Sequence, residues 1–253
     1  MTIAERHAQI LLQLKNKGYV RVTDLANNMD VSLVTIRKDL KTLEERGQLF
    51  RAHGSASLRQ PNTFEKHVNE KESLHVEEKS RISQQAASLL KAEQAIVIGS
   101  GTTCLAFARS LPTDLPLTVL TGAMNISLSL MNLERIELIQ LGGMVRKSAT
   151  SVVGPYAEEM LSHFSCNTLF LGVDGLSPDF GLTTSNALEA HLNKQMIKSV
   201  EKTVVLADSS KFGLRGFGKI CEVEDIDLLV TDDKVSEFLV KEFEERGVEV
   251  LVA

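Results

Sequence analysis

The chain has 253 residues, of which 43% are hydrophobic and 24% charged, and its formal net charge is −5. This composition is that of an ordinary globular protein, large enough for one large domain or for a large and a small one. The negative total argues against a general polyanion binder, yet residues 1–60 hold ten Lys and Arg against six Asp and Glu. That segment carries +4 and the rest of the chain −9, so the positive charge is local.

The cysteines and apolar runs bear on metal sites and location. The three cysteines, Cys104, Cys166 and Cys221, lie far apart and form no C-x-x-C pair, so we predict neither a disulfide framework nor a metal site. We also predict no cofactor. Charges are scattered through residues 1–18, which argues against a signal peptide, and no later apolar run reaches membrane-spanning length. We therefore expect a cytoplasmic protein with buried, reduced thiols.

Two amphipathic helices are predicted before residue 31. The first has Thr2 as a candidate N-cap and Gly18 as a candidate C-terminal cap. Its apolar face would consist of Ile3, Ile10, Leu11 and Leu14. The second helix covers residues 22–29 with Thr23 as its N-cap. It would bury Leu25, Ala26 and Met29.

A third helix is predicted from Ser32, its N-cap, to about Arg46. Its core-facing residues would be Val34, Ile36, Leu40 and Leu43. Its outer side would carry basic and hydroxyl groups, with the candidate DNA-binding residues Ser32, Leu33, Thr35, Arg37, Lys38 and Lys41. A short helix, a tight turn and a second helix with such a face form a helix-turn-helix, whose second helix fits the major groove.

The residues that follow predict a two-stranded wing. Residues 48–57 alternate apolar and polar and turn at Gly54, which would carry Arg51 and His53 toward a DNA backbone. A charged helix face is also typical of a plain solvated surface. Helix pattern and local charge therefore leave both interpretations open.

A longer match favours DNA binding. Residues 25–56, LANNMDVSLVTIRKDLKTLEERGQLFRAHGSA, resemble the N-terminal signature of the DeoR family of bacterial transcriptional regulators. The resemblance implies a recognition helix that carries Thr35, Arg37 and Lys38. It also implies that His53 and Gly54 lie in the wing. The family's usual second glycine after the histidine is Ser55 here.

The rest of the chain predicts an α/β domain. Residues 59–63, RQPNT, have the composition of an exposed joint, where we expect limited proteolysis to cut. We predict a winged helix-turn-helix DNA-binding domain over 1–60, a linker over 61–74 and an effector-sensing and oligomerisation domain over 75–253. Seven short β-rich apolar runs alternate with helical segments in the last part: 95–99, 117–121, 136–141, 168–173, 203–207, 228–231 and 248–252. This order predicts a mostly parallel sheet with helices on both faces.

Ligands of such sheets bind at the carboxyl ends of the strands. The first run is followed by Ser100, Gly101, Thr102 and Thr103, a hydroxyl-rich loop that opens a helix and whose N–H groups suit a phosphate. The other strand ends add the candidates Asn125, Gly142, Gly143, Arg146, Asp174, Gly175 and Lys211. Five polar strand ends together favour an anionic polyhydroxyl ligand over plain turn chemistry.

A nicotinamide dinucleotide is the obvious competing ligand. Residues 99–104, GSGTTC, hold the first two glycines of a G-x-G-x-x-G run. The third small position is Cys104, however, and the next strand end supplies no Asp or Glu for a ribose hydroxyl. The context therefore argues against this cofactor.

The strand ends also resemble the DeoR effector domain, which is related in fold to ribose-5-phosphate isomerase and coenzyme A transferases. The matching runs are S-G-T-T, G-G-x-x-R, the D-G pair, GLTTSNALEA and DSSKFG. The resemblance implies a sugar phosphate or related metabolite as effector, with residues 100–103 at the phosphate. It places Asp174 and Glu189 at hydroxyls and Lys211 near the anion.

Two positions depart from the family pattern. Gly99 stands where an acidic residue is common, and Gly122 where an asparagine is common. Each change removes a polar group from the same pocket mouth, and a net hydrogen bond is worth about 0.5–1.5 kcal/mol. We therefore expect the usual ligand to bind poorly or to be exchanged for another.

These patterns predict a sequence-specific regulator, a repressor of a carbohydrate-metabolism operon controlled by a phosphorylated sugar, and not an enzyme. Its partners would be a double-stranded DNA operator and further copies of the chain, as a dimer or tetramer, because half-sites match protein symmetry. The alternatives are a sugar-phosphate isomerase or hydrolase with a helical appendage, using Asp174, Glu189, Asp208 and Lys211, and a protein-interaction module. The sign of the ligand's effect stays open.

Overall fold

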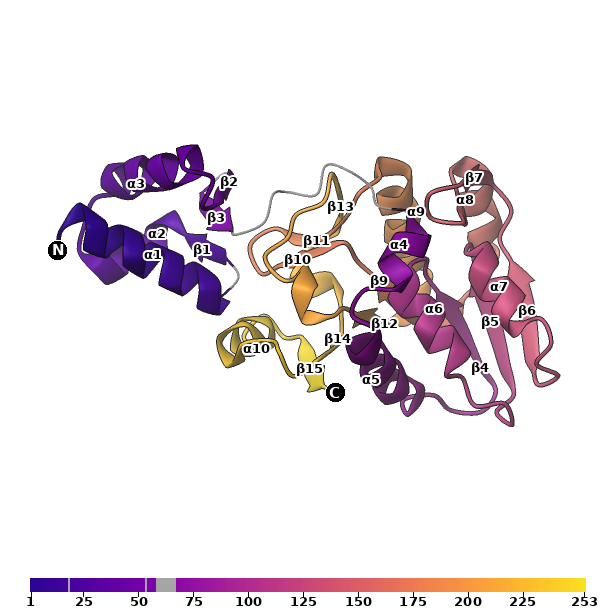
Figure 1. The fold of residues 1–253 in the computed structure, drawn as a ribbon. Helices are drawn as coiled ribbons and strands as arrows, with labels where there is room; N and C mark the ends of the chain where they lie inside the picture. The colour runs from indigo at the N-terminus through magenta and orange to yellow at the C-terminus, as the bar shows by residue number, and fades with distance from the viewer. Residues whose placement is uncertain (18, 53, 58–66) are drawn as a thin grey trace.

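The computed structural model describes residues 1–17, 19–52, 54–57 and 67–253 (Figure 1). The N-terminal unit contains three helices and three short strands. In chain order these are α1 (Ile3–Lys17), β1 (Tyr19–Arg21), α2 (Val22–Met29), α3 (Leu33–Glu45), β2 (Phe50–Ala52) and β3 (Ser55–Ser57). The strands form an antiparallel sheet in the order β1-β3-β2, so the predicted wing gains a third strand from the segment between α1 and α2.

The three helices enclose a separate apolar core. Its fully buried members include Ile10, Leu14, Leu25, Ile36, Leu40 and Leu43. Two predicted caps are confirmed, because Ser32 Oγ accepts from Thr35 N at 3.1 Å and Thr2 Oγ1 accepts from Glu5 N at 3.3 Å. The predicted three-helix unit with a wing is therefore the observed one.

Three local predictions are wrong. Val34 is 70% exposed, because it lies two residues from the buried Ile36 and so points to the other side of α3. Ile3 is 63% exposed, since Arg6 and His7 occupy the buried face of the first turn of α1. Helix α2 begins at Val22 with Arg21 in the capping position, so Thr23 lies inside the helix. The predicted C-terminal cap Gly18 lies outside the described residues.

The C-terminal unit is built on a seven-stranded sheet. All seven predicted runs form its strands, which are β4 (Gln94–Ile98), β5 (Leu117–Thr121), β6 (Ile136–Gln140), β9 (Cys166–Gly172), β12 (Val200–Leu206), β14 (Leu228–Thr231) and β15 (Glu249–Val252). Their order is β15-β14-β12-β9-β4-β5-β6, and every neighbouring pair is parallel. The predicted fold class, a small winged helix-turn-helix followed by an α/β domain with a parallel sheet, is confirmed.

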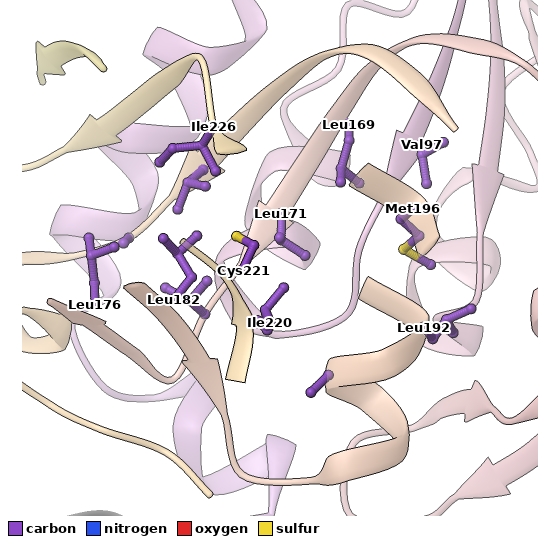
Figure 2. Packing of buried hydrophobic residues seen from close by; sticks show 14 of the residues in the cluster. Val97, Leu169, Leu171, Leu176, Leu182, Leu192, Met196, Ile220, Cys221 and Ile226 are labelled. Carbon is purple, nitrogen blue, oxygen red and sulfur yellow. The ribbon is translucent and has the colours of Figure 1, made fainter. Parts of the chain in front are cut away.

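Helices cover both faces of this sheet. They are α5 (Val76–Ala87), α6 (Thr102–Arg109), α7 (Met124–Leu130), α8 (Pro155–Leu161), α9 (Ala187–Lys198) and α10 (Glu237–Glu244). Within β4, Ile96 and Ile98 pack with residues of α5 and α6, whereas Val97 packs on the opposite face. Figure 2 shows that opposite face, where Leu169 and Leu171 of the sheet meet Leu192 and Met196 of α9.

Smaller elements complete this unit. They are α4 (Val68–Glu72), β7 (Met144–Arg146), β8 (Ser151–Val153), β10 (Gly175–Ser177), β11 (Gly181–Thr184), β13 (Gly218–Cys221) and the 3-10 helices η1 (Ser209–Lys211) and η2 (Val223–Asp225). Strands β10, β11 and β13 form a second, antiparallel sheet that packs on the main core. The predicted linker 61–74 thus contains a helix, α4. Residues 61–66 of the linker lie outside the described part of the chain.

The order of the strands creates one switch point. The chain adds β5 and β6 on one side of β4, and it adds β12, β14 and β15 beyond β9 on the other. Strands β4 and β9 are neighbours, so the connections leave their carboxyl ends in opposite directions. A crevice at such a point is where open parallel sheets bind ligands.

Contacts join the two units. Tyr19 is 6% exposed and belongs to the same core as Phe243, and its Oη donates to Glu242 Oε2 at 2.6 Å. Arg21 forms an ion pair with Asp179 and lies 3.4 Å from Glu242. Strand β1 of the N-terminal unit therefore contacts α10 through the side chains of Tyr19 and Arg21.

Two further observations concern the whole described chain. No helix in the described ranges is both long and apolar enough to cross a membrane. All three cysteines are free thiols and all are buried, as expected. Burial raises the pKa of the Cys104 thiol to about 12.

Candidate DNA interface and ligand pocket

The exposed face of α3 carries the predicted reading residues. The turn before it depends on Asp30, which adopts a left-handed φ of 52° and lets the chain reverse between α2 and α3. Arg37, Lys38 and Lys41 are exposed on the outer side of α3, and Leu33 is 40% exposed near its start. The Ser32 hydroxyl is engaged as the helix cap and also lies 2.9 Å from Thr35 Oγ1. The basic residues thus face outward from a rigid helix.

The wing is attached to the same helix. Glu44 of α3 accepts from Arg51 N at 3.0 Å and from Arg51 Nε at 2.6 Å. This pair fixes the position of β2 against α3, and Arg51 remains at the surface. Lys41 lies 3.8 Å from Glu45 one turn away. The predicted wing residue His53 lies outside the described residues.

A buried ion cluster lies behind α3, on the side opposite its basic face, and no sequence pattern predicted it. Asp39 is 5% exposed and pairs with Arg6, whose Nη2 donates at 3.0 Å, and with His7 Nε2 at 3.2 Å. Burial alone would raise the pKa of Asp39, but hydrogen bonds from Arg6 and His7 lower it below its ordinary value. The cluster ties α1 to α3.

A pocket lies at the carboxyl ends of β4 and β9, as the strand order predicts. Seven of the predicted effector residues line it: Ser100, Gly101, Thr102, Thr103, Asp174, Glu189 and Lys211. Eight residues that were not predicted complete the lining: Val68, Lys71, Ser148, Ala149, Gly172, Val173, Thr184 and Ser185. Segments far apart in the sequence therefore converge on one site.

One wall of the pocket is the start of α6. Gly101 is the capping residue with φ 111°, a conformation that favours glycine, and nothing lies within 4 Å of the place where a Cβ would be. The first N–H groups of an α-helix have no acceptor within the helix, and a glycine cap offers no side-chain acceptor. This wall is suited to an anion.

Glu189 is the hub of a second wall. Its carboxylate accepts from Ser100 Oγ at 2.6 Å, from Thr184 Oγ1 at 2.8 Å and from Arg146 Nη1 at 2.5 Å. Asn186 caps α9 and accepts from Glu189 N at 3.2 Å, which fixes the direction of the side chain. The carboxylate is thus held in a fixed position at the pocket.

Asp174 forms the third wall. Its carboxylate accepts from Lys71 Nζ at 2.7 Å, from Ser185 N at 3.0 Å and from Thr184 Oγ1 at 3.2 Å. Burial opposes ionisation, but the charges of Lys71 and Lys211 and these hydrogen bonds lower the pKa of Asp174 to about 2. Two lysines and two carboxylates therefore share the pocket.

Five predicted residues do not line the pocket. They are Asn125, Gly142, Gly143, Arg146 and Gly175. The first four follow β5 and β6, one and two strands away from β4. Gly175 is tightly packed, since a Cβ there would lie 2.4 Å from the Leu214 carbonyl oxygen. Arg146 acts on the pocket indirectly through Glu189.

Some lining residues had a weak signal in the sequence. Thr184 and Ser185 belong to the run GLTTSNALEA, which was singled out only for Glu189. Lys71 had no signal, because it lies in the predicted linker among many other charged residues.

Comparison with protein families decides the identity of both units. A DeoR-like helix-turn-helix domain matches residues 6–62, and a DeoR C terminal sensor domain matches residues 74–233. The chain belongs to the DeoR family of transcriptional regulators. Its helix-turn-helix is thus a DNA-binding domain, and its pocket lies in the DeoR sensor domain, which implies a small-molecule effector.

Curated relatives match this DeoR chain over nearly its whole length. The uncharacterized HTH-type transcriptional regulator YulB of Bacillus subtilis is 36% identical over 250 residues, covering 99% of this chain and 96% of the relative. A putative aga operon transcriptional repressor of Escherichia coli O157:H7 is 34% identical over 251 residues, covering 98% and 93%. These DeoR relatives are regulators, which confirms the prediction of a regulator rather than an enzyme.

Solved structures match less closely. A ribose 5-phosphate isomerase A from Methanocaldococcus jannaschii has a TM-score of 0.40 at 20% identity and covers 53% of each chain. A probable sor operon regulator from Shigella flexneri has a TM-score of 0.43 at 12% identity and covers 66% of this chain and 89% of that one.

Proposed function

We propose that this DeoR regulator represses a carbohydrate-metabolism operon and that a phosphorylated sugar, bound in the sensor pocket, controls its hold on the operator. The observation that supports this most is the composition of the pocket. A helix start with a glycine cap, two lysines and two carboxylates converge where β4 and β9 end. A phosphate suits the first two features, and sugar hydroxyls suit the carboxylates.

The operator side of the proposal rests on the outer face of α3 and on the wing. The residues proposed to contact DNA are Ser32, Leu33, Thr35, Arg37, Lys38, Lys41, Arg51 and His53. A single small reading unit makes few base contacts, so we propose a dimer or tetramer whose symmetry matches paired half-sites. We keep the domain boundaries at 1–60, 61–74 and 75–253. We also propose a cytoplasmic location, because a regulator that binds an operator must be in the compartment that holds the DNA.

The ligand side of the proposal assigns each pocket wall a role. Residues 100–103 and Lys211 would hold the phosphate, and Asp174 and Glu189 would accept hydrogen bonds from hydroxyls. Arg146 would hold the Glu189 carboxylate in place through their ion pair. Asn125, Gly142, Gly143 and Gly175 would act as neighbours of the pocket and not as ligand contacts, in agreement with their positions.

Gly99 and Gly122 support a ligand that differs from the family's usual one. A Cβ at Gly99 would lie 3.1 Å from Leu171 Cδ1, and one at Gly122 would lie 3.3 Å from Val152 Cγ2. Both contacts are tight, so the surrounding packing fits glycine at each position. The packing around Gly99 and Gly122 therefore leaves no room for the acidic and asparagine side chains that are common at these positions in the family.

The test combines two measurements on the full chain. Sequencing of genomic fragments retained by the protein identifies the operator, and a panel of sugar phosphates with their free sugars is then screened for thermal stabilisation, operator release and turnover. We expect a phosphate ester to stabilise the protein and to change operator binding without turnover. Equal stabilisation by the unphosphorylated sugar would contradict the proposed ligand class.

A variant tests the phosphate position. Thr102→Glu places a negative charge at the start of α6, where the phosphate would bind, so we expect the response to phosphate esters to disappear. Thr102→Ser keeps the hydroxyl and serves as the control, and operator binding without ligand should be unchanged in both. A full response in a folded Thr102→Glu protein would rule out the phosphate at this position.

A further inference from the structure

Helix α4 closes one side of the pocket and is attached at three points. Val68 N donates to the Ser148 carbonyl oxygen at 2.8 Å, Lys71 Nζ donates to Asp174 at 2.7 Å, and Arg109 Nη1 donates to Glu72 at 2.7 Å. The anchors belong to the loop after β7, the end of β9 and helix α6. This short helix therefore touches three separate parts of the sensor domain.

A buried lysine holds α4 from beneath. Lys79 of α5 is 5% exposed, and its Nζ donates to the carbonyl oxygens of Lys71 and Leu74, each at 2.6 Å. Burial lowers the pKa of Lys79 from its ordinary value. The backbone around Lys71 is thus positioned by the domain core, and its side chain is directed to Asp174.

The Lys71 ammonium lies between a carboxylate and the place proposed for an anion. The side chain of Lys71 keeps 25% of its surface exposed, although it pairs with a carboxylate that is largely buried. A phosphate at residues 100–103 would share the pocket with the Asp174 carboxylate. Two negative charges in one partly buried site repel each other. A cation that contacts both groups removes this conflict.

We propose that Lys71 is a ligand-binding residue of the sensor pocket, shared between Asp174 and the ligand's anionic group, and that occupancy of the pocket thereby repositions α4. This inference rests on the proposed function and identifies α4 as the element that changes position when the ligand binds. Helix α4 lies in the proposed linker, between the DNA-binding unit and the sensor domain in the chain. If α4 has one position with the pocket empty and another with the pocket occupied, a ligand that binds more tightly to one of these conformations increases its population.

Binding measurements on three variants test the residue. Inorganic phosphate and the sugar-phosphate panel are titrated against the wild-type chain, Lys71→Met, Lys71→Arg and Lys219→Met. Lys219 is a matched control because it also pairs with a carboxylate, Glu222, at 2.5 Å, but lies outside the pocket lining. We expect the Kd for phosphate compounds to rise by about tenfold or more in Lys71→Met and to change less than about threefold in the other two.

A second readout separates ligand binding from a structural role. Hydrogen exchange of the amides of residues 68–72 should change when the wild-type chain is saturated with phosphate or its ester. We expect this change to be lost in Lys71→Met and kept in Lys71→Arg. If Lys71→Met only lowers the melting temperature of the unliganded protein and keeps the wild-type Kd, Lys71 is a structural counterion and the inference is overturned.

The two proposals fail in different ways. If no phosphate compound stabilises the wild-type chain, the proposed effector class fails and the role of Lys71 fails with it. If the wild type responds and Lys71→Met responds with equal affinity, only the role of Lys71 fails. A wild-type response with unchanged exchange at residues 68–72 overturns the movement of α4.

Discussion

The DNA-binding unit and the sensor domain use charged residues in opposite ways. On α3, Arg37 and Lys38 face solvent, whereas the charged residues behind the helix, Arg6 and Asp39, are buried and bind each other. In the pocket of the sensor domain, charged groups of opposite sign, such as Lys71 and Asp174, form ion pairs with each other. A helix that reads DNA needs outward charges on a rigid body, whereas a sensor needs paired groups whose partners a ligand can replace.

The difference has an energetic consequence. Exposed charges interact over a long range with a polyanion and are screened by salt, and they contribute little to folding. Charges inside a pocket interact more strongly, because less water surrounds them. Substitution on the exposed face of α3 should therefore change DNA binding and not stability, whereas substitution in the buried clusters should change stability first.

The largest expected effect comes from breaking the cluster behind α3. Asp39→Asn leaves Arg6 and His7 without their carboxylate in a buried site, so we expect the DNA-binding unit to lose about 3–5 kcal/mol of stability. Glu45→Gln is the matched control, because Glu45 lies on the same helix but is exposed. It should cost less than about 0.5 kcal/mol in urea unfolding. Equal effects of the two variants would show that the cluster is not structurally important.

The next effect sharpens the contrast on the outer face. Arg37→Ala should weaken operator binding by about 1–3 kcal/mol and leave the melting temperature unchanged, because the residue is exposed and is proposed to contact a base edge or a phosphate. Lys15→Ala removes an exposed charge from α1 and should leave operator binding unchanged. Operator titrations at two salt concentrations measure both. Wild-type affinity in Arg37→Ala would contradict the assignment of α3 as the recognition helix.

A pH series tests the paired charges of the sensor pocket. The pKa of Asp174 in the folded protein, about 2, lies below the unfolded value, so its contribution is present above about pH 4 and is lost as the pH falls toward 2. The shift corresponds to roughly 2 kcal/mol. We expect urea unfolding to show that the stability difference between wild type and Asp174→Asn shrinks over this range. A difference that does not vary with pH would mean that the carboxylate is not stabilised by its partners.

The smallest effect concerns the contact between the two units. Tyr19→Phe removes the hydrogen bond to Glu242 but keeps the ring packed, so we expect the contact to weaken by about 1 kcal/mol. Calorimetry should then resolve the unfolding of the two units more clearly than in the wild type. Tyr156→Phe, at a tyrosine that is 71% exposed, is the control and should leave the trace unchanged. Identical traces for all three proteins would show that the contact does not couple the units.

Local pattern in the sequence predicted most of the fold. Apolar spacing located α1 to α3 and all seven strands of the parallel sheet, because buried faces repeat every 3.6 residues in helices and apolar runs mark fully buried strands. The errors at Ile3, Val34 and Thr23 lie in first turns of helices. In a first turn, the position at which the helix begins determines which side chains are buried, and the 3.6-residue spacing of apolar residues does not.

Prediction of the pocket was less complete. The rule that ligands bind at strand ends found six lining residues, and the resemblance to the DeoR effector domain added Glu189, but the rule also selected Asn125, Gly142, Gly143 and Arg146 after β5 and β6. The sequence does not show which strands are neighbours at the switch point, so it predicts no difference between one strand end and another. The order of the strands removes β5 and β6 from the centre of the site.

The sequence by itself determined the two units, the helix α3 with its basic outer face and the hydroxyl-rich start of α6, because each depends on residues close together in the chain. Only the tertiary structure decided which charges meet. Lys71 and Asp174 are 103 residues apart, and Arg6 and Asp39 are 33 apart. Such pairs form because packing of the apolar cores brings their elements together and removes the water that would otherwise solvate each charge.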